Sequence, residues 1–328
     1  MSFKICSIGC GGMATLAHGP SLRKYARLHP DTELAACCDL DDAKAAAFQS
    51  AFGFQRRYGD VREMLRAEKP DAVSLVVPVH LAAGLAIEIL EMGFPLIMEK
   101  PPGMNRTETL RIIETSERRG VPTQAAFNRR YTPLVNAFKN MILACPSPLQ
   151  SIRCDFFRVN RPDPDFSTTA IHGIDLVRYV ADTDYEHVRF RYREYPALGP
   201  NVADVFMDCT LKTGATAQLS ICPFSGMGAE RLTAHAIGHS FLMYDEKIGS
   251  DFPRRLVHIQ ENQVRDMRTG ADVDGGGEPF ETGGFYHENA SFFDDIRSGR
   301  RPKGDVKSAL QSVEVAQCIR ERRAEYGA

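Results

Sequence analysis

The sequence has no long run of acidic or basic residues, and its 40 Lys and Arg residues nearly balance its 42 Asp and Glu residues. A formal net charge of -2 argues against the strongly basic surface of a nucleic-acid-binding protein or of a polybasic membrane-surface protein. We therefore expect no nucleic-acid partner and no membrane partner.

Long apolar runs are also missing. The uncharged stretch between Asp71 and Glu88 contains Ser74 and Pro78, and it is shorter than the roughly 20 apolar residues that a membrane span needs. It predicts a buried strand followed by a helix. The apolar residues after Lys4 are better explained as a strand and a glycine turn than as a targeting segment.

The nine cysteines form no C-x-x-C pair and no Cys/His cluster with the spacing of zinc ligands. We therefore predict no metal site. Cys37 and Cys38 are neighbours on a predicted strand, so their side chains point to opposite faces. Buried free thiols of this kind indicate a reducing compartment, the cytoplasm.

What the chain does contain is enough sequence for two domains: 328 residues with 43% hydrophobic and 25% charged residues. Strands and helices alternate in the first third, which predicts a doubly wound parallel sheet of the Rossmann type over residues 1–126. The predicted strands there are 3–8, 33–38, 72–77, 95–98 and 122–126, and the predicted helices are 41–52, 61–68, 81–92 and 106–119.

Residues 127–328 are predicted to form an α+β domain with a large, mostly antiparallel sheet, because strands follow one another with short turns. The predicted strands are 151–157, 187–195, 203–211, 217–222, 231–237, 241–244 and 256–260. Helices are expected at 133–143, 172–180, 288–296 and 307–326, and a mobile loop at 270–284.

A glycine-rich turn follows the first strand and predicts a dinucleotide site. Gly9 allows a tight turn, Gly11 lets the backbone approach a pyrophosphate, and the small Ala14 lets the next helix pack closely. The N-terminus of that helix offers free N–H groups to phosphates. The predicted cofactor-binding residues of this turn are Gly9, Gly11, Gly12, Met13 and Ala14.

Asp39 ends the second strand, 25 positions after Ala14, where an acidic residue roughly 20 positions on accepts hydrogen bonds from a ribose. Leu40 follows it, so no adjacent arginine welcomes a 2′-phosphate. The sequence thus favours NAD over NADP. The alternative is a glycine turn that binds no ligand, with a solvated Asp39.

Glu99-Lys100-Pro101 ends the predicted fourth strand. Ligands of doubly wound sheets lie beyond the carboxyl ends of the strands, so Lys100 is placed near the cofactor. Burial and neighbouring charges can lower the pKa of such a lysine and make it a useful hydrogen-bond donor or acid. Taken alone, the motif also fits a lysine in a surface turn.

Several motifs occur in a fixed order: the glycine turn, Asp39, Val77-Pro78-Val79-His80, Glu99-Lys100-Pro101 and Asn128-Arg129-Arg130-Tyr131-x-Pro133. Together they resemble the Gfo/Idh/MocA family, the family of glucose–fructose oxidoreductase and inositol dehydrogenase. The resemblance is strongest from Lys4 to Pro133 and recurs at 285–294 and in the last helix.

The resemblance implies a Rossmann domain, a second domain with a large sheet, and a homodimer or homotetramer formed through the open face of that sheet. It implies that Lys100 lies near the nicotinamide and the substrate hydroxyl. Further cofactor-binding positions that it implies are Pro78, His80, Glu99, Lys100, Asn128 and Arg129.

One position departs from the family pattern, which places an aspartate four residues before a histidine and another three residues after it. His172 and Asp175 match, but Thr168 replaces the upstream aspartate. Threonine cannot accept a proton at neutral pH, so His172 is the predicted proton acceptor; the alternative is a core histidine bonded to backbone. Asp163 and Asp165 could supply the missing carboxylate, although solvated acids in a proline-rich loop are the favoured explanation.

Arg158 and Arg161 could clamp a substrate carboxylate, since a guanidinium pairs with a carboxylate in bidentate fashion. Ordinary surface arginines are the alternative. With Thr168 and Asp175 they form the predicted substrate-binding set. Tyr286 and His287 are secondary candidates for which a structural role is favoured.

The sequence thus predicts an NAD(H)-dependent oxidoreductase that acts on a secondary alcohol or ketone of a sugar, sugar acid or cyclitol, with Lys100 and His172 as catalytic residues. Two alternatives stay open. One is an enzyme that uses NAD in a transient oxidation during glycosidic cleavage or elimination, which the Thr168 departure favours. The other is a non-catalytic dinucleotide-binding regulator.

Overall fold

The computed structural model describes residues 2–163, 165–246 and 252–327, and the chain divides into two compact units. The first unit comprises Met1–Tyr131 and Glu278–Val313, and the second comprises Thr132–Gly277 and Glu314–Ala328. Glu278–Val313, which the predicted boundary placed in the second domain, therefore packs in the first unit.

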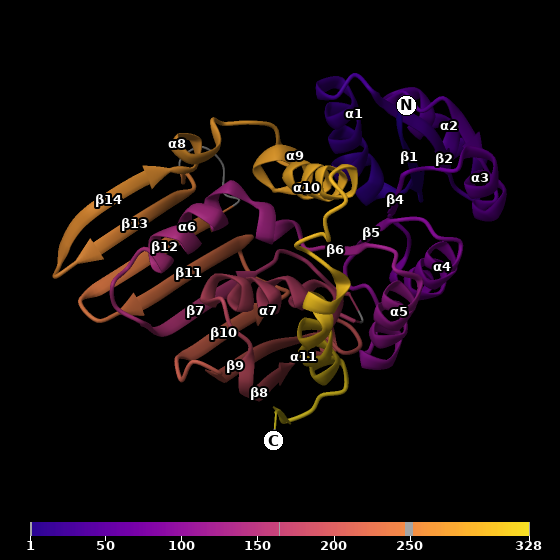
Figure 1. Cartoon of the computed structure of the whole chain (residues 1–328). Helices are drawn as coiled ribbons and strands as arrows, with labels where there is room; N and C mark the ends of the chain where they lie inside the picture. The colour runs from indigo at the N-terminus through magenta and orange to yellow at the C-terminus, as the bar shows by residue number, and fades with distance from the viewer. Residues whose placement is uncertain (1, 164, 247–251, 328) are drawn as a thin grey trace. The chain divides into compact units, whose positions relative to one another are not determined.

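A six-stranded sheet forms the centre of the first unit, in the order β3-β2-β1-β4-β5-β6 with every pair parallel (Figure 1). Its strands are β1 (Phe3–Ile8), β2 (Thr32–Cys38), β3 (Arg56–Tyr58), β4 (Ala72–Leu75), β5 (Leu96–Glu99) and β6 (Thr123–Ala126). The predicted doubly wound sheet is confirmed. Only β3 was not expected, because three residues are too few to show a period.

The helices of this unit begin and end at residues with clear physical roles. Asp41, Asp60 and Asn105 each accept hydrogen bonds from backbone N–H groups at a helix start. Gly120, at φ 64°, ends the helix predicted over 106–119. The helices are η1 (Ala14–His18), α1 (Gly19–Leu28), α2 (Asp42–Phe52), α3 (Val61–Glu68), α4 (Val79–Glu91), α5 (Arg106–Arg119), η2 (Asn128–Tyr131), α9 (Pro279–Thr282), α10 (Phe285–Arg297) and η4 (Val306–Ala309).

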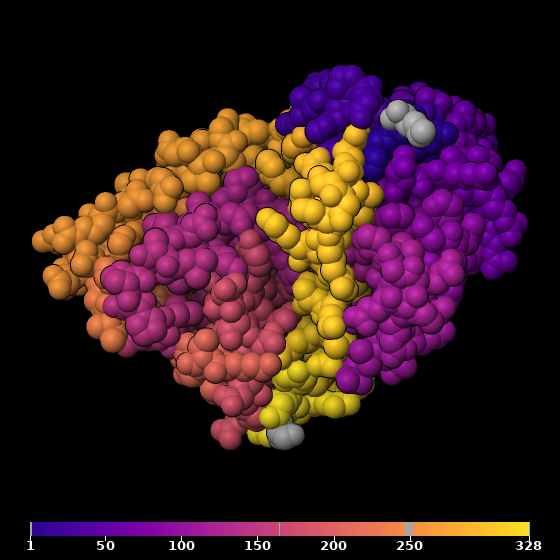
Figure 2. Space-filling view, in the orientation of Figure 1, coloured from indigo at the N-terminus to yellow at the C-terminus, as the bar shows by residue number. Residues whose placement is uncertain are grey.

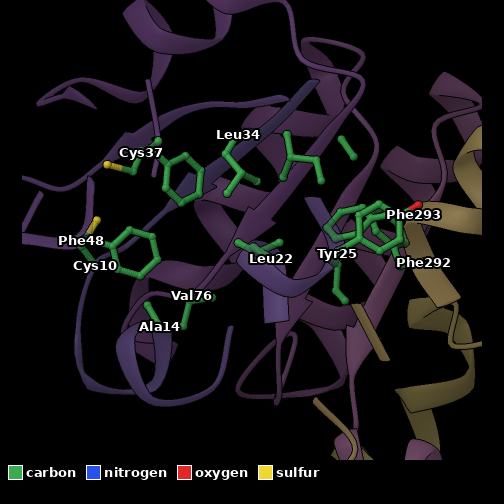
Figure 3. Close-up of a cluster of buried hydrophobic side chains, with 14 of the residues drawn as sticks. Cys10, Ala14, Leu22, Tyr25, Leu34, Cys37, Phe48, Val76, Phe292 and Phe293 are labelled. Atoms are coloured by element: carbon green, nitrogen blue, oxygen red, sulfur yellow. The ribbon is translucent and has the colours of Figure 1, made fainter. Parts of the chain in front are cut away.

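The core of the first unit includes side chains from the returning segment. Phe292 and Phe293 of α10 are fully buried, and the ring of Phe293 lies 5.1 Å from that of Tyr25 on α1 (Figure 3). The Tyr25 hydroxyl donates to Asp294 at 2.8 Å. Apolar burial and this hydrogen bond hold α10 in the first unit, although 269 positions separate Tyr25 from Asp294 along the chain.

A nine-stranded sheet forms the second unit, in the order β14-β13-β12-β11-β7-β10-β9-β8-β15. All its pairs are antiparallel except β7 with β10, so the predicted mostly antiparallel sheet is confirmed. The strands are β7 (Leu149–Phe157), β8 (Tyr185–Glu194), β9 (Ala203–Leu211), β10 (Thr216–Cys222), β11 (Ala229–Ala236), β12 (His239–Glu246), β13 (Arg255–Gln260), β14 (Gln263–Thr269) and β15 (Glu325–Tyr326).

Helices α6 (Pro133–Leu143) and α7 (Ser167–Ala181) lie on one face of this sheet (Figure 1). Strand β14 is an edge strand, in orange at the left of the space-filling view, and its Met267 is 67% exposed (Figure 2). The shorter helices here are η3 (Pro196–Leu198) and α8 (Gly270–Asp274), while α11 (Leu310–Arg320) begins in the first unit and ends in the second.

Two predictions about the C-terminal third were wrong. The expected mobile loop at 270–284 contains α8 and α9, each with a capping box, Thr269 with Asp272 and Glu278 with Glu281. The helix expected over 307–326 ends at Arg320, and its last residues form β15 on the edge of β8. Arg322 adopts a positive φ of 51°, which breaks the helical repeat.

Candidate functional site

The glycine turn is built so that only glycine fits at its first position. Gly9 has φ +90°, and a Cβ atom added to it would lie 2.0 Å from the carbonyl oxygen of Val76. The Gly9 N–H donates to Cys38 O, and the Val76 N–H donates to Ile8 O. The turn after β1 is therefore pressed between the ends of β2 and β4.

The next positions are open instead of crowded. A Cβ atom added to Gly11 or Gly12 would meet no atom within 4 Å, and Met13 is 46% exposed. Ala14 is fully buried where the helix packs on the sheet. The helix thus starts beside free space, and this combination fits a dinucleotide pyrophosphate placed against helix N–H groups.

Asp39 follows β2 and is held in a fixed orientation. Its Oδ2 atom accepts the Cys10 N–H at 2.8 Å, and its Oδ1 atom accepts the Asp41 N–H at 2.9 Å. A carboxylate accepts more than two hydrogen bonds, so Asp39 keeps acceptor capacity for ribose hydroxyls. Leu40 beside it is 91% exposed.

Pro78 and His80 lie just beyond β4, at the start of α4, and both are exposed. Glu99 ends β5, and its Oε2 atom accepts the backbone N–H of Lys100 at 3.0 Å. All four residues therefore lie at or just beyond the carboxyl ends of the neighbouring parallel strands β4 and β5, at the edge of the sheet where the glycine turn also lies.

A residue that sequence reasoning missed completes this group. His18 is 1% exposed, and its Nε2 atom lies 2.9 Å from Glu99 Oε1. Burial alone would raise the pKa of Glu99, but the hydrogen bond with His18 and the nearby charge of Lys100 hold this pKa below its usual value. No local signal marks His18, because its partner lies 81 positions away.

Asn128 and Arg129 lie in η2, after β6. Asn128 is buried and donates to the carbonyl oxygen of Gly283 at 2.8 Å, while Arg129 donates to Asn128 Oδ1 at 2.9 Å. Asn128 thus ties β6 to the segment before α10. Binding of cofactor by these two residues stays a prediction.

The second unit holds the remaining candidates. Arg158 is 14% exposed and pairs with Glu230, which is 5% exposed, at 2.5 Å. The Arg158 guanidinium also lies 3.7 Å from the centre of the Phe156 ring. Arg158 is therefore not an ordinary surface arginine, and its charge is balanced by a buried carboxylate that the sequence did not single out.

Arg161 is 42% exposed and pairs with Asp163 at 2.8 Å, and its Nη2 atom donates to Thr169 Oγ1. Asp165 is not a solvated acid: it accepts hydrogen bonds from Ser167 at the start of α7 and pairs with Arg320 at 2.9 Å. Its carboxylate therefore has partners in both chain segments of the second unit, Ser167 and Arg320.

Thr168, His172 and Asp175 all lie on α7. The Thr168 hydroxyl donates to Asp165 O at 3.1 Å, and His172 is 7% exposed. Asp175 is 1% exposed and lies 3.7 Å from Arg178. Helix α7 approaches the sheet closely at Gly173, where an added Cβ atom would meet the Phe156 ring at 3.3 Å.

The predicted cofactor residues thus all lie in the first unit, and the predicted substrate residues all lie in the second. Lys100 belongs to the first and His172 to the second. Among residues 2–163, 165–246 and 252–327, no three His, Cys, Asp or Glu side chains are grouped to hold a metal ion. Within the same ranges, every helix is too short or too polar to cross a membrane.

Comparison with known proteins agrees with this arrangement. A family model described as the oxidoreductase family with an NAD-binding Rossmann fold, Gfo/Idh/MocA, matches residues 3–127. The D-apiose dehydrogenase of Paraburkholderia graminis is 29% identical over 138 residues, which cover 41% of this chain and 35% of the relative. The inositol 2-dehydrogenase of Rubrobacter xylanophilus is 26% identical over 232 residues, which cover 68% of this chain and 65% of the relative.

The match thus spans from about a third to just under two thirds of the length of these curated relatives. The fold extends further than the sequence match. The solved structure of a levoglucosan dehydrogenase, in complex with NADH and levoglucosan, superposes with a TM-score of 0.82 at 18% identity and covers 99% of both chains. Residues 3–127 thus match the Gfo/Idh/MocA oxidoreductase family, and the whole chain has the fold of the levoglucosan dehydrogenase.

Proposed function

We propose that this protein is an NAD(H)-dependent oxidoreductase that moves a hydride between nicotinamide and a secondary alcohol or ketone of a sugar, sugar acid or cyclitol. The observation that carries the proposal is the cradle formed by Gly9 against Val76, the open space at Gly11 and Gly12, and Asp39 beyond β2. The names of the relatives, which act on inositol, apiose or levoglucosan, support the substrate class.

NAD is the proposed cofactor, with NADP less favoured. Asp39 is oriented by the N–H groups of Cys10 and Asp41, and as a carboxylate it would accept hydrogen bonds from both ribose hydroxyls. A 2′-phosphate at this place would face the Asp39 charge, and Leu40 offers no compensating donor.

In this proposal His172 accepts the proton of the substrate hydroxyl, since an imidazole titrates near neutral pH. Lys100 donates a hydrogen bond to the same oxygen and stabilises the negative charge that develops on it. Bound nicotinamide supplies the hydride acceptor or donor. Glu99, fixed by His18, holds the Lys100 backbone at the end of β5.

Among the candidate substrates, the pairing of the arginines favours uncharged sugars and cyclitols over sugar acids. Arg158 is balanced by Glu230, and Arg161 by Asp163. A substrate carboxylate would have to displace one of these carboxylates to form a bidentate pair, and displacing the buried Glu230 would leave a buried charge without its partner.

Thr168 favours one alternative, in which the oxidation is transient and no net redox change occurs. The position carries a hydroxyl, and the nearby Asp165 is engaged by Ser167 and Arg320, so His172 would work without a carboxylate four residues upstream. Such an enzyme would release a cleaved or eliminated product without accumulating NADH. A dehydrogenase accumulates NADH in proportion to product.

The test is a screen of sugars, uronates and inositols with NAD and NADP in parallel, following the absorbance of reduced cofactor. We expect turnover with NAD that falls at least about 100-fold in Lys100→Ala and in His172→Ala, within the range lost with one acid–base group or oxyanion donor. The matched controls, Lys303→Ala and His235→Ala, change exposed residues and should keep wild-type rates.

Full activity in both Lys100→Ala and His172→Ala would refute the assigned roles. NAD binding without turnover across the whole panel would favour the non-catalytic regulator instead.

We also propose that the chain forms a homodimer or homotetramer through the sheet face opposite α6 and α7. Arg189 and Arg191 of β8 are more than 70% exposed on that face, and Arg191 lies 3.6 Å from Asp208 of β9. This alternation of charge could pair with its own copy. Light scattering after gel filtration tests this, and a monomer at all concentrations would refute it.

The nine free thiols support a reducing compartment, which we propose is the cytoplasm; cell fractionation would test it.

A further inference from the structure

The helix that follows the glycine turn contains an irregular segment whose last residue is His18. Residues Ala14–His18 form a π-helix, in which the Gly19 N–H donates to Ala14 O. A π-segment inserts an extra residue into the helical repeat, and such insertions occur frequently at functional sites. Here it carries His18 into the interior of the first unit, where the side chain is 1% exposed.

Both ring nitrogens of His18 have a partner. Nε2 lies 2.9 Å from Glu99 Oε1, and Nδ1 lies 3.2 Å from the side-chain nitrogen of Asn289 on α10. The same Asn289 nitrogen donates to the carbonyl oxygen of Phe285 at 2.9 Å. The Phe285 ring packs edge-on against the imidazole, at 5.8 Å between ring centres.

These contacts determine where the imidazole proton lies. The carbonyl oxygen of Phe285 can only accept, so the atom of Asn289 that faces it must be the NH2 group. The second proton of that NH2 group then points to His18 Nδ1, which must accept it. A neutral imidazole has one donor and one acceptor, so the proton is on Nε2 and is donated to Glu99.

The orientation of the Asn289 amide leaves one of its atoms without a hydrogen bond. Its Oδ1 atom is buried and has no hydrogen-bond partner among the residues that the structure describes. A buried acceptor without a partner is unfavourable. The Asn289 amide therefore lacks one hydrogen bond in the orientation that holds His18 in the Nε2–H tautomer.

The Glu99 carboxylate connects His18 to Lys100. Its Oε1 atom receives the His18 proton and its Oε2 atom accepts the Lys100 backbone N–H at 3.0 Å. We propose that His18, oriented by Asn289, is a positioning residue that couples the glycine-turn helix to Lys100 through the Glu99 carboxylate. This inference rests on the proposed catalytic role of Lys100.

Two substitutions of His18 separate positioning from mere packing. The amide nitrogen of glutamine stands close to the position of Nε2, so His18→Gln keeps a donor for Glu99. Asparagine is shorter, so His18→Asn can still meet Asn289 but cannot reach Glu99. His235→Asn, at an exposed histidine of the second unit, is the matched control.

The first readout is the pH profile of turnover. Without the Nε2 donor the partly buried Glu99 protonates more readily, so its pKa rises and Lys100 loses its ionised neighbour at a higher pH. We expect the acid limb of kcat in His18→Asn to move up by about one pH unit, and kcat to fall about tenfold, with KM for NAD within about twofold of wild type. His18→Gln should restore the wild-type profile.

An unchanged acid limb in His18→Asn, with thermal stability lowered equally in both variants, would overturn the proposal, because His18 would then only fill space.

The second readout needs no turnover and no cofactor. In protein labelled with 15N-histidine, long-range 1H–15N spectra should show His18 as the Nε2–H tautomer at neutral pH, with its signals absent from His18→Asn.

An Nδ1–H tautomer, or a doubly protonated ring, would overturn the proposal even if the variants fail to fold. The two proposals fail in different ways. If the wild-type protein turns over no substrate, the proposed function fails, whereas the tautomer of His18 still supports or refutes the network.

Discussion

Replacing Gly9 with alanine should lower the free energy of unfolding of the first unit, whereas replacing Gly11 with alanine should not. At Gly9 a Cβ atom would lie 2.0 Å from Val76 O, and the backbone φ of +90° is one that side chains rarely adopt. The positive φ costs about 1–3 kcal/mol. Forcing the atoms apart costs about 1–3 kcal/mol more, as overpacking does.

The two terms give a loss of about 2–6 kcal/mol in the free energy of unfolding, a large share of the roughly 5–15 kcal/mol that a typical domain has. For a unit of this size, 1 kcal/mol moves Tm by about 2–4 °C, so Gly9→Ala should lower Tm by at least about 4 °C. Gly11 has open space for a Cβ atom. Gly11→Ala should therefore leave Tm unchanged or raise it slightly.

For NAD binding we expect Gly11→Ala, which should not lower Tm, to have a large effect. The open space at Gly11 is where we place the pyrophosphate, so Gly11→Ala should weaken NAD binding at least about tenfold while the protein stays folded. Differential scanning calorimetry and titration with NAD measure the two effects on the same samples. The reasoning is refuted if Gly9→Ala melts with wild-type Tm, or if Gly11→Ala binds NAD as tightly as wild type.

Three further predictions concern charge. Asp39→Ala should weaken NAD binding about 10-fold to 100-fold, because hydrogen bonds to a charged group are lost. The same substitution should reduce the preference for NAD over NADP, and unchanged affinity for both cofactors in a titration would contradict this. Arg158→Ala leaves the buried Glu230 without its guanidinium, and should destabilise the second unit by about 3–5 kcal/mol in urea unfolding; the double variant with Glu230→Gln should recover part of that loss, and no recovery would refute the pairing. The hydrogen bond from Arg56 holds the pKa of Glu68 below its usual value, so its stabilisation is present above the unfolded pKa of about 4.3 and is lost as pH falls through the folded pKa. Glu68→Gln should flatten that acid limb of stability, and an unchanged limb would exclude Glu68 as a source.

Much of the candidate cofactor site could be predicted from the sequence because its signals are local. The glycine turn, Asp39 and Glu99-Lys100 each stand directly after a strand with a clear apolar pattern, and parallel strands bring their carboxyl ends to one edge. His18 could not be found in this way. Its position depends on a π-segment and on partners 81 and 271 positions away, neither of which leaves a local pattern.

The same distinction explains differences between prediction and structure after residue 127. Arg158 follows β7 and pairs with Glu230 of β11 across 72 positions, so the sequence alone could not distinguish this arginine from a surface residue. The short helices α8 and α9 are a different case. Their capping boxes, Thr269 with Asp272 and Glu278 with Glu281, are visible in the sequence, but the surrounding glycines and acids suggested a loop.

Several elements were determined by the sequence alone. The helices over 61–68, 106–119 and 133–143 and the strand over 203–211 have the predicted bounds, because caps and hydrophobic period act over a few residues. Only the tertiary structure decided that Glu278–Val313 returns to the first unit, that the last helix ends at Arg320, and that His18 meets Glu99 and Asn289. The physical reason is that each of these depends on burial and hydrogen bonds between residues far apart along the chain, and such contacts exist only once the sheets have formed.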